Sequence, residues 1–322
     1  MFSPTSKITT AQATIIIINY MLAAGVLTLP RTVTEQTQSP DGWISVLLGG
    51  VLAVIAGMII VKLSQQYPKE TFYEYSRHIV GKWLGHLISI VFITYFLALG
   101  AFEVRVMSEI VDFFLLEGTP SWAIIMTVLW IGLYSITQGL DPIARLFEMI
   151  FPITVIIFLT IALMSLGIFE INNLRPVLGD GIMPVLRGVK TTNLSFTCSE
   201  IMLILVAFMK KPKNAVKAVV IGTGVVTSFY MITLIMVIGA LSVEGVVTRT
   251  WPGLDLMRSF EIPGLIFERF ESFLLVIWIM QLFATFIITF YAASLGVSQV
   301  FKKKPLSRSE EHTSELQSQF HL

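Results

Sequence analysis

Long apolar runs, separated by short polar segments, dominate the chain. Eight runs are marked by their lack of charge, at about residues 8–29, 43–61, 83–111, 121–140, 149–169, 191–209, 218–243 and 272–301; the third is free of charge as far as Glu103, and the sixth contains Glu200. A helix needs roughly 20 residues, at about 1.5 Å each, to cross a hydrocarbon layer about 30 Å thick. Unpaired backbone groups cannot face lipid, so these runs must be helical. The pattern therefore predicts an all-α polytopic membrane protein.

Composition excludes several other classes. The 322 residues are 55% hydrophobic and 13% charged, whereas soluble domains carry about 25% charged residues. The net charge of +1 gives no basic field for nucleic acid. A single cysteine, Cys198, and four scattered histidines exclude a disulfide framework, and we expect no metal site and no cofactor. No nucleophile and base pair stands out, so we do not expect an enzyme.

Basic residues in the connecting segments predict the orientation. If the N-terminus is cytoplasmic, that side receives thirteen Lys and Arg residues and the opposite side receives seven. Cytoplasmic loops carry the excess of Lys and Arg in membrane proteins. We therefore expect a cytoplasmic N-terminus.

The C-terminal residues differ from everything before them. The stretch from Arg308 to Ser318 is polar and aperiodic, and it reads like an in-frame translation of a common DNA-sequencing adapter. Such segments are excluded from fold reasoning. We expect residues 1–304 to form the transmembrane permease-like domain and residues 305–322 to be a non-native tail on a truncated copy; a natural disordered tail is the alternative.

The first apolar run contains a helix-weakening stretch. Ala23, Ala24 and Gly25 lie five to seven residues before Pro30, and glycine and proline both weaken a helix interior. Amide and carbonyl groups freed there could bind a ligand, because broken helices at membrane depth occur where they line a cavity or are buried in protein. The alternative is a small-residue face that packs on a neighbouring helix.

The sixth run offers a counterpart. Its hydroxyl-rich and amide-containing stretch from Thr191 to Glu200 could cap a helix opening. A carboxylate in lipid is unfavourable, so Glu200 should face protein or water, either as a gating or coupling group or as a structural residue. Corresponding interruptions in two halves of a chain indicate a transporter-type binding site.

Two further groups lie within other runs. Arg105 and Glu109 are four residues apart on one predicted helix face. This spacing predicts an ion pair near the outer interface; the alternative is that Glu103 or Arg105 serves as a gate or as a partner for a ligand carboxylate. In the last run, Gln281 and Thr285 are polar groups that either pack against neighbouring helices or join a site.

Several motifs resemble one known family. Gly25-Val-Leu-Thr-Leu-Pro30 resembles the first-helix signature of amino-acid/polyamine/organocation (APC) permeases. The segment from Tyr75 to Gly85 and the stretch Phe196-Thr-Cys-Ser-Glu200, with Lys210-Lys-Pro-Lys-Asn214 after it, are similar to later motifs of that superfamily. From about Thr5 to Lys304 the chain most resembles the B subunits of Ger-type spore germinant receptors, the endospore germination permease branch.

The resemblance implies an APC/LeuT-like inverted-repeat fold of ten helices, here truncated to about eight. It implies a ligand site between the broken first and sixth helices, near the third and eighth. Carried over by position, the ligand-binding residues are Ala23, Ala24, Gly25, Val26, Leu194, Ser195, Phe196 and Thr197. The chain departs from the pattern in two ways, because it has eight runs and because its sixth run lacks a central glycine.

Two functions remain open at this stage. The first is a multi-pass subunit in the inner membrane of the spore that binds a small germinant such as an amino acid. It would signal to an A subunit and a C-subunit lipoprotein, which the resemblance implies as partners besides membrane lipid. The second is a proton- or sodium-coupled amino-acid transporter of the APC superfamily, with Glu200 as the coupling residue.

Overall fold

The computed structural model describes residues 7–197, 199–259 and 270–301. Apart from one isolated backbone bridge, its regular structure there is helical. The long helices are α1 (Thr10–Thr37), α2 (Gly42–Ser64), α4 (Lys82–Phe114), α5 (Ser121–Thr137), α6 (Leu140–Ser165), α7 (Met183–Phe196), α9 (Ala215–Thr248) and α11 (Phe270–Val300). The short ones are α3 (Phe72–Val80), α8 (Met202–Leu205), α10 (Pro252–Arg258) and the 3-10 segments η1 (Leu166–Ile168), η2 (Ile171–Leu174), η3 (Ser199–Ile201), η4 (Val206–Phe208) and η5 (Pro212–Asn214).

Each predicted apolar run coincides with a long helix or with a broken helical span. Within the described residues, six spans are long and apolar enough to cross a membrane, and the bent helix α1 makes a seventh. Helix α5 is apolar but has only 17 residues, which is about 26 Å of helix. The prediction of an all-helical, multi-pass membrane protein is confirmed.

Some helices extend beyond the predicted apolar runs. Helix α6 begins at Leu140, nine residues before the predicted run at 149, because charged residues also fit its first turns. There, Arg145 Nη2 lies 2.9 Å from Asp141 Oδ2 in an i,i+4 ion pair. Helix α1 continues to Thr37, with Pro30 inside it. The predicted tail at 305–322 lies outside the described residues.

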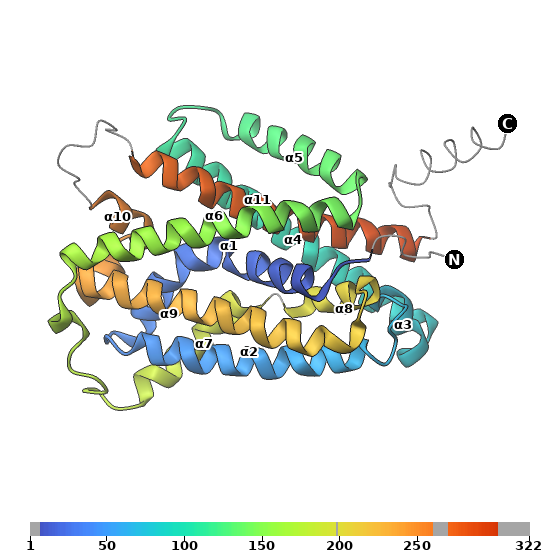
Figure 1. Ribbon diagram of the computed structural model, residues 1–322, viewed down its shortest axis with the longest axis horizontal. Coiled ribbons are helices and arrows are strands. Elements are labelled where there is room, and N and C mark those ends of the chain that lie inside the picture. The colour runs from blue at the N-terminus through green and yellow to red at the C-terminus, as the bar shows by residue number, and fades with distance from the viewer. Residues whose placement is uncertain (1–6, 198, 260–269, 302–322) are drawn as a thin grey trace.

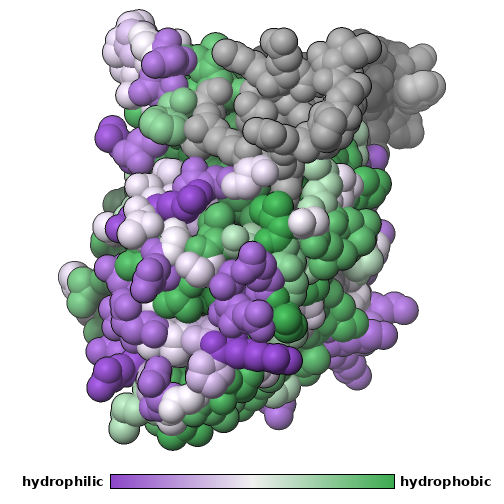
Figure 2. Space-filling model, turned by 90° about the vertical axis from the view of Figure 1, so that its left-hand side faces the viewer, coloured by the Kyte–Doolittle hydropathy of each residue, from purple (hydrophilic) through white to green (hydrophobic). Residues whose placement is uncertain are grey.

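Helix α1 lies in the middle of the bundle (Figure 1). It packs against α9 and α7 on one side and against α6 and α11 on the other. Helix α2 packs against α7 and α9, whereas α4 packs along α11. Figure 2 looks onto the end of the bundle that carries α10, and hydrophilic side chains gather there. The helix that contains the predicted ligand motif is therefore enclosed by the others.

The segment before α4 forms the short helix α3. Thr71 and Glu74 form a capping box at the start of α3, with the Thr71 amide 3.0 Å from Glu74 Oε2. Tyr73 and Tyr75 are buried, while Ile79 is 48% exposed, so the face that carries the two tyrosines packs against α4 and α11. Burial raises the pKa of Tyr75 to about 12, against the lowering effect of its hydrogen bond with Ser64.

Glycines allow α2 to approach its neighbours closely. A Cβ atom at Gly50 would overlap the side chain of Thr227 on α9, and one at Gly49 would overlap Thr192 on α7. Lipid is as apolar as the helix surfaces, so the hydrophobic effect does not drive helices together inside a membrane. Their association depends on close van der Waals packing, which small residues allow. The contact of α2 with α9 therefore depends on the missing side chain at position 50.

We expect Gly50→Leu to destabilise the fold by about 1–3 kcal/mol through overpacking. Thermal unfolding of the purified protein in detergent measures this effect. The matched control is Gly224→Leu on α9, where a Cβ atom meets nothing within 4 Å. Equal unfolding temperatures for the two variants would contradict the packing described here.

Candidate ligand site between two broken helices

Helix α1 is broken at Ala23. The backbone there has φ −27° and ψ −116°, and the two halves, Thr10–Ala23 and Gly25–Thr37, meet at a bend of 52°. The interruption predicted in the first run is confirmed, but it falls at Ala23, and Pro30 lies within the second half. A break at this place interrupts the regular path of the backbone inside the span.

Side chains of other helices bind main-chain carbonyls that lie before the break. In a continuous helix the carbonyls of residues 19–22 accept hydrogen bonds from amides four residues later. Here Gln281 Nε2 of α11 donates to the Asn19 carbonyl over 2.7 Å, and Thr285 Oγ1 donates to it over 3.2 Å. The Gln281 amide is oriented in turn by Thr154 Oγ1 of α6, 3.2 Å from its Oε1. Packed polar groups therefore support the break.

The sixth span is broken as well. Helix α7 ends at Phe196, and Thr197 has φ −57° and ψ 157°, which is not helical. The span resumes at Ser199 as η3, followed by α8 and η4. Thr197 Oγ1 donates to the Leu194 carbonyl over 2.6 Å, so a hydroxyl caps the opening, as the composition of this stretch predicts.

The two breaks face each other across one tyrosine hydroxyl. The Tyr230 hydroxyl of α9 bonds to the Met21 carbonyl, before the first break. It also lies 3.2 Å from the Ser195 carbonyl, before the second. Gly25 permits this approach, since a Cβ atom there would overlap the Tyr230 hydroxyl. The Phe196 ring packs edge-on against the Tyr230 ring, with centroids 5.3 Å apart.

A hydrogen-bond network surrounds the partly buried Glu200, just after the second break. Tyr20 of α1 and Tyr95 of α4 donate their hydroxyls to Glu200 Oε1 over 3.0 Å and 2.9 Å. Hydroxyl donors compensate a carboxylate for the water that it loses on burial. One carboxylate thus links three elements close to both breaks.

The far ends of the two broken spans are also joined. The Ile8 amide donates to the Phe208 carbonyl over 2.9 Å, and the Lys210 amide donates to the Ile8 carbonyl over 2.8 Å. This is a parallel bridge between Ile8 and Met209. The first half of α1 and the segment η3–α8–η4 are therefore attached to each other near the breaks and at the opposite end.

Comparison with known proteins places the chain in a family. The family model described as "Spore germination protein" matches residues 7–309. Spore germination protein YndE of Bacillus subtilis (strain 168) is 99% identical over 307 residues, which cover 95% of this chain and 85% of that protein. Spore germination proteins A2 and B2 of the same organism are 41% and 36% identical, each covering 92% of this chain and 81% of the relative.

The chain belongs to the spore germination protein family. The resemblance to the Ger-type germination permeases inferred from its motifs is confirmed.

The structure of this spore germination protein brings together most of the residues expected at the site. Ala23, Val26 and Phe196 are buried, Ala24 lies between the two halves of α1, and Ser195 contributes its carbonyl. The side chain of Leu194, by contrast, is 81% exposed. Thr197 is exposed too. Successive helical residues point in directions about 100° apart, so four consecutive side chains cannot share one site.

The charged residues of α4 lie in two different environments. Arg105 Nε lies 2.7 Å from Glu109 Oε1, and the two side chains are 64% and 48% exposed. The ion pair expected from their spacing is formed, which favours the structural interpretation for Arg105. Glu103 is 5% exposed within the bundle, and its role in gating stays a prediction.

The sequence reasoning missed three tyrosines at the site, namely Tyr20, Tyr95 and Tyr230. Each lies inside an apolar run, and a buried tyrosine hydroxyl usually has a hydrogen-bond partner. That rule could have marked these residues as polar contacts between helices. It could not have identified main-chain carbonyls as the partners of Tyr230.

Tyr230→Phe removes the hydroxyl between the two breaks and keeps the ring. We expect a loss of about 1–3 kcal/mol in stability, since buried carbonyls lose a donor. Thermal unfolding measures the loss. Tyr134→Phe on α5 is the control, because that side chain is 66% exposed. A Tyr230→Phe protein as stable as the control would show that the hydroxyl does not hold the breaks together.

Proposed function

We propose that this protein is the membrane subunit of a germinant receptor and that it binds a small zwitterion, such as an amino acid, between the two broken helices. One observation carries the proposal. A single hydroxyl, that of Tyr230, reaches carbonyls before both breaks, Met21 and Ser195. The space between the breaks therefore accepts a hydrogen-bond donor that both helices hold, and the ammonium group of an amino acid is such a donor.

Groups near the breaks also suit the carboxylate and the side chain of an amino acid. The second half of α1 begins at Gly25, and a helix N-terminus favours a carboxylate through its free amides and its dipole. The rings of Phe196 and Tyr230, which pack against each other, offer apolar contact to a side chain. In this proposal the ammonium replaces the Tyr230 hydroxyl on one or both carbonyls.

The packing supports an APC-type inverted-repeat arrangement. Helices α1 and α2 pack against α7 and α9, so the first two spans associate with the sixth and seventh. Broken helices at corresponding places in two halves of a chain are typical of such folds. We extend the proposal to the inner spore membrane, to a cytoplasmic N-terminus, and to an A subunit and a C-subunit lipoprotein as partners. The role is that of a sensor and not of an enzyme.

A ligand can signal only if it binds one conformation of the protein more tightly than the other. A shift of a two-state equilibrium from 1:99 to 99:1 requires about 5.5 kcal/mol of differential affinity. The first half of α1 and η3–α8–η4 are joined through Glu200 and through the Ile8 bridge. We propose that these two segments move as one unit when the ligand displaces Tyr230, and that partner subunits detect this movement.

Gly25→Leu tests the site directly. We expect one or more of the twenty common L-amino acids to raise the unfolding temperature of the purified wild-type protein. We expect the same amino acids to leave Gly25→Leu unshifted, because the new side chain occupies the place of the Tyr230 hydroxyl.

Gly224→Leu, which faces open space on α9, should respond as the wild type does. An unchanged response in Gly25→Leu, at a normal protein level, would remove the site from the breaks. No response of the wild type to any of the twenty amino acids would contradict an amino-acid ligand.

A coupled transporter is the second candidate function. The Glu200 carboxylate, held by Tyr20 and Tyr95 between three elements, favours it, because carboxylates within membranes serve as proton or ion relays. Liposomes that contain the protein without partner subunits separate the two functions. The sensor proposal predicts no uptake of the stabilising amino acid above protein-free liposomes. Uptake that Glu200→Gln abolishes would support the transporter and contradict the sensor.

A further inference from the structure

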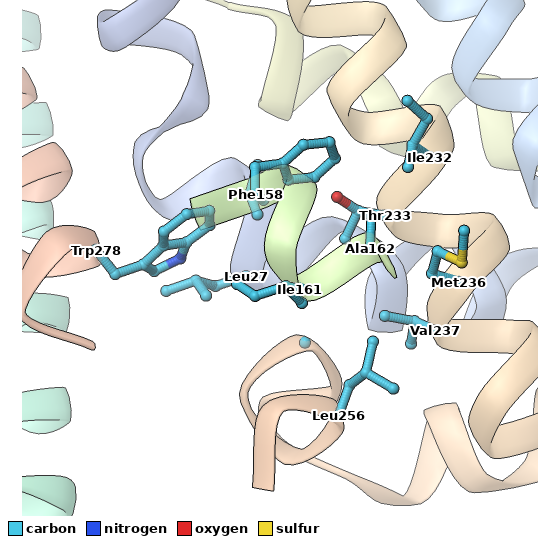
Figure 3. A pocket seen from close by; sticks show the side chains of 12 residues that line it. Leu27, Phe158, Ile161, Ala162, Ile232, Thr233, Met236, Val237, Leu256 and Trp278 are labelled. Carbon is cyan, nitrogen blue, oxygen red and sulfur yellow. The ribbon is translucent and has the colours of Figure 1, made fainter. Parts of the chain in front are cut away.

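An apolar cavity of about 30 Å³ lies beside the second half of α1. Its walls come from α1, α6, α9, α10 and α11 (Figure 3), and its described lining includes no charged residue. One water occupies roughly 10–15 Å³ of such a volume, so the space holds no more than a few atoms. The cavity is therefore a gap in the packing and not a site for a polar ligand.

Exposed lysines gather at the end of the bundle where α2 ends and α9 begins. The Gln65 side-chain amide, just after α2, donates to the carbonyls of Pro212 and Lys213 over 2.8 Å and 3.2 Å. This contact brings the last turn of α2 beside the segment that leads into α9. The exposed lysines of the two segments, which we call the lysine cluster, are Lys62, Lys210, Lys211, Lys213 and Lys217.

No acidic side chain pairs with the lysine cluster among the described residues, because the ion pairs found there all involve other groups. Basic groups elsewhere at this end of the bundle do have such partners, as in the pair of Arg145 with Asp141. The sequence contains no Asp or Glu from residue 201 to residue 243. The positive end of the α9 dipole also disfavours the cations in its first turn. An anion bound here would therefore stabilise this end of the bundle.

An exposed aliphatic surface leads away from the lysine cluster. Helices α2 and α9 pack side by side (Figure 1). On α2, the exposed side chains of Val51, Ile55 and Ile59 repeat every four residues toward the cluster, which places them along one helix face. On α9, Val220 and Ile221 are exposed one turn after the last lysine of the cluster. Positive charge thus lies at one end of an apolar surface that two helices share.

We propose that the lysine cluster and this aliphatic surface bind an anionic phospholipid, with its phosphate among the lysines and its acyl chains along α2 and α9. Clusters of four to eight basic residues next to a membrane helix attract anionic headgroups, by about a factor of five in affinity for each residue. The Lys210 amide donates to the Ile8 carbonyl over 2.8 Å. The bound lipid therefore contacts the segment that joins the ends of both broken spans. The inference does not depend on the proposed function.

Native mass spectrometry of the purified full chain in a neutral detergent measures the dissociation constant of the first bound lipid. Phosphatidylglycerol and phosphatidylcholine with the same oleoyl chains are matched probes, because they differ in the net charge of the headgroup. We expect the chain to bind phosphatidylglycerol more tightly by about tenfold or more, since several lysines act together.

Two pairs of substitutions locate the site. Lys213→Gln combined with Lys217→Gln removes two charges from the lysine cluster. We expect the affinity for phosphatidylglycerol to fall about 25-fold, at about fivefold for each lysine, and the affinity for phosphatidylcholine to stay unchanged. The control combines Lys69→Gln with Lys82→Gln, which are exposed lysines at the same end of the bundle but outside the cluster. The control pair should keep most of the affinity for phosphatidylglycerol.

Glycerol 3-phosphate distinguishes a lipid from a free phosphate, because it carries the charge without the acyl chains. It should not displace phosphatidylglycerol when it is present at the same concentration.

Three results would each overturn the proposal, namely an equal loss of affinity in the control pair, displacement of the lipid by glycerol 3-phosphate, and equal affinity for the two lipids. Equal affinity would leave an acidic segment of a partner protein as the occupant of the cluster. Unfolding temperatures in lipid-free detergent check that both variants are folded. If either variant is not, the comparison of the two lipids on the wild type decides.

Discussion

Main-chain carbonyls exposed by a helix break inside a membrane must find hydrogen-bond donors, and this requirement organises the centre of the bundle. Lipid offers none, so the donors come from neighbouring helices. Gln281 and Thr285 of α11 bond to the Asn19 carbonyl, and Tyr230 of α9 bonds to the Met21 carbonyl. The same tyrosine reaches the Ser195 carbonyl of the second broken span. Polar contacts from α9 and α11 to α1 therefore accompany the apolar packing of these helices.

The break in α1 also separates two halves of the helix that contact different elements. The first half of α1 is joined to η3–α8–η4 by the Tyr20 bond to Glu200 and by the bridge at Ile8. The second half of α1 contacts α10 and the apolar cavity instead. A ligand between the breaks thus touches two differently supported halves of one helix. This is the geometry that a binding protein needs if occupancy is to change a packing equilibrium.

The sequence predicts the helical class and the number of apolar runs well, because charge-free runs of this length have one stable form in lipid. It also indicates both interruptions, from Gly25 and from the hydroxyls near Thr197. It fails for features that depend on tertiary contacts. The break falls at Ala23, inside the stretch that the sequence marks, but Tyr230 is absent from the predicted site. Sequence spacing cannot show that a tyrosine more than 200 residues away will reach the Met21 carbonyl.

The most direct test of the central claim is an experimental density map of the protein in nanodiscs, with and without an amino acid that stabilises it. The account predicts that the Tyr230 hydroxyl lies between the Met21 and Ser195 carbonyls in the free protein. With the amino acid bound, its ammonium should occupy that place and the hydroxyl should withdraw. Helices that run unbroken through Ala23 and Thr197, or ligand density away from both breaks, would contradict the account.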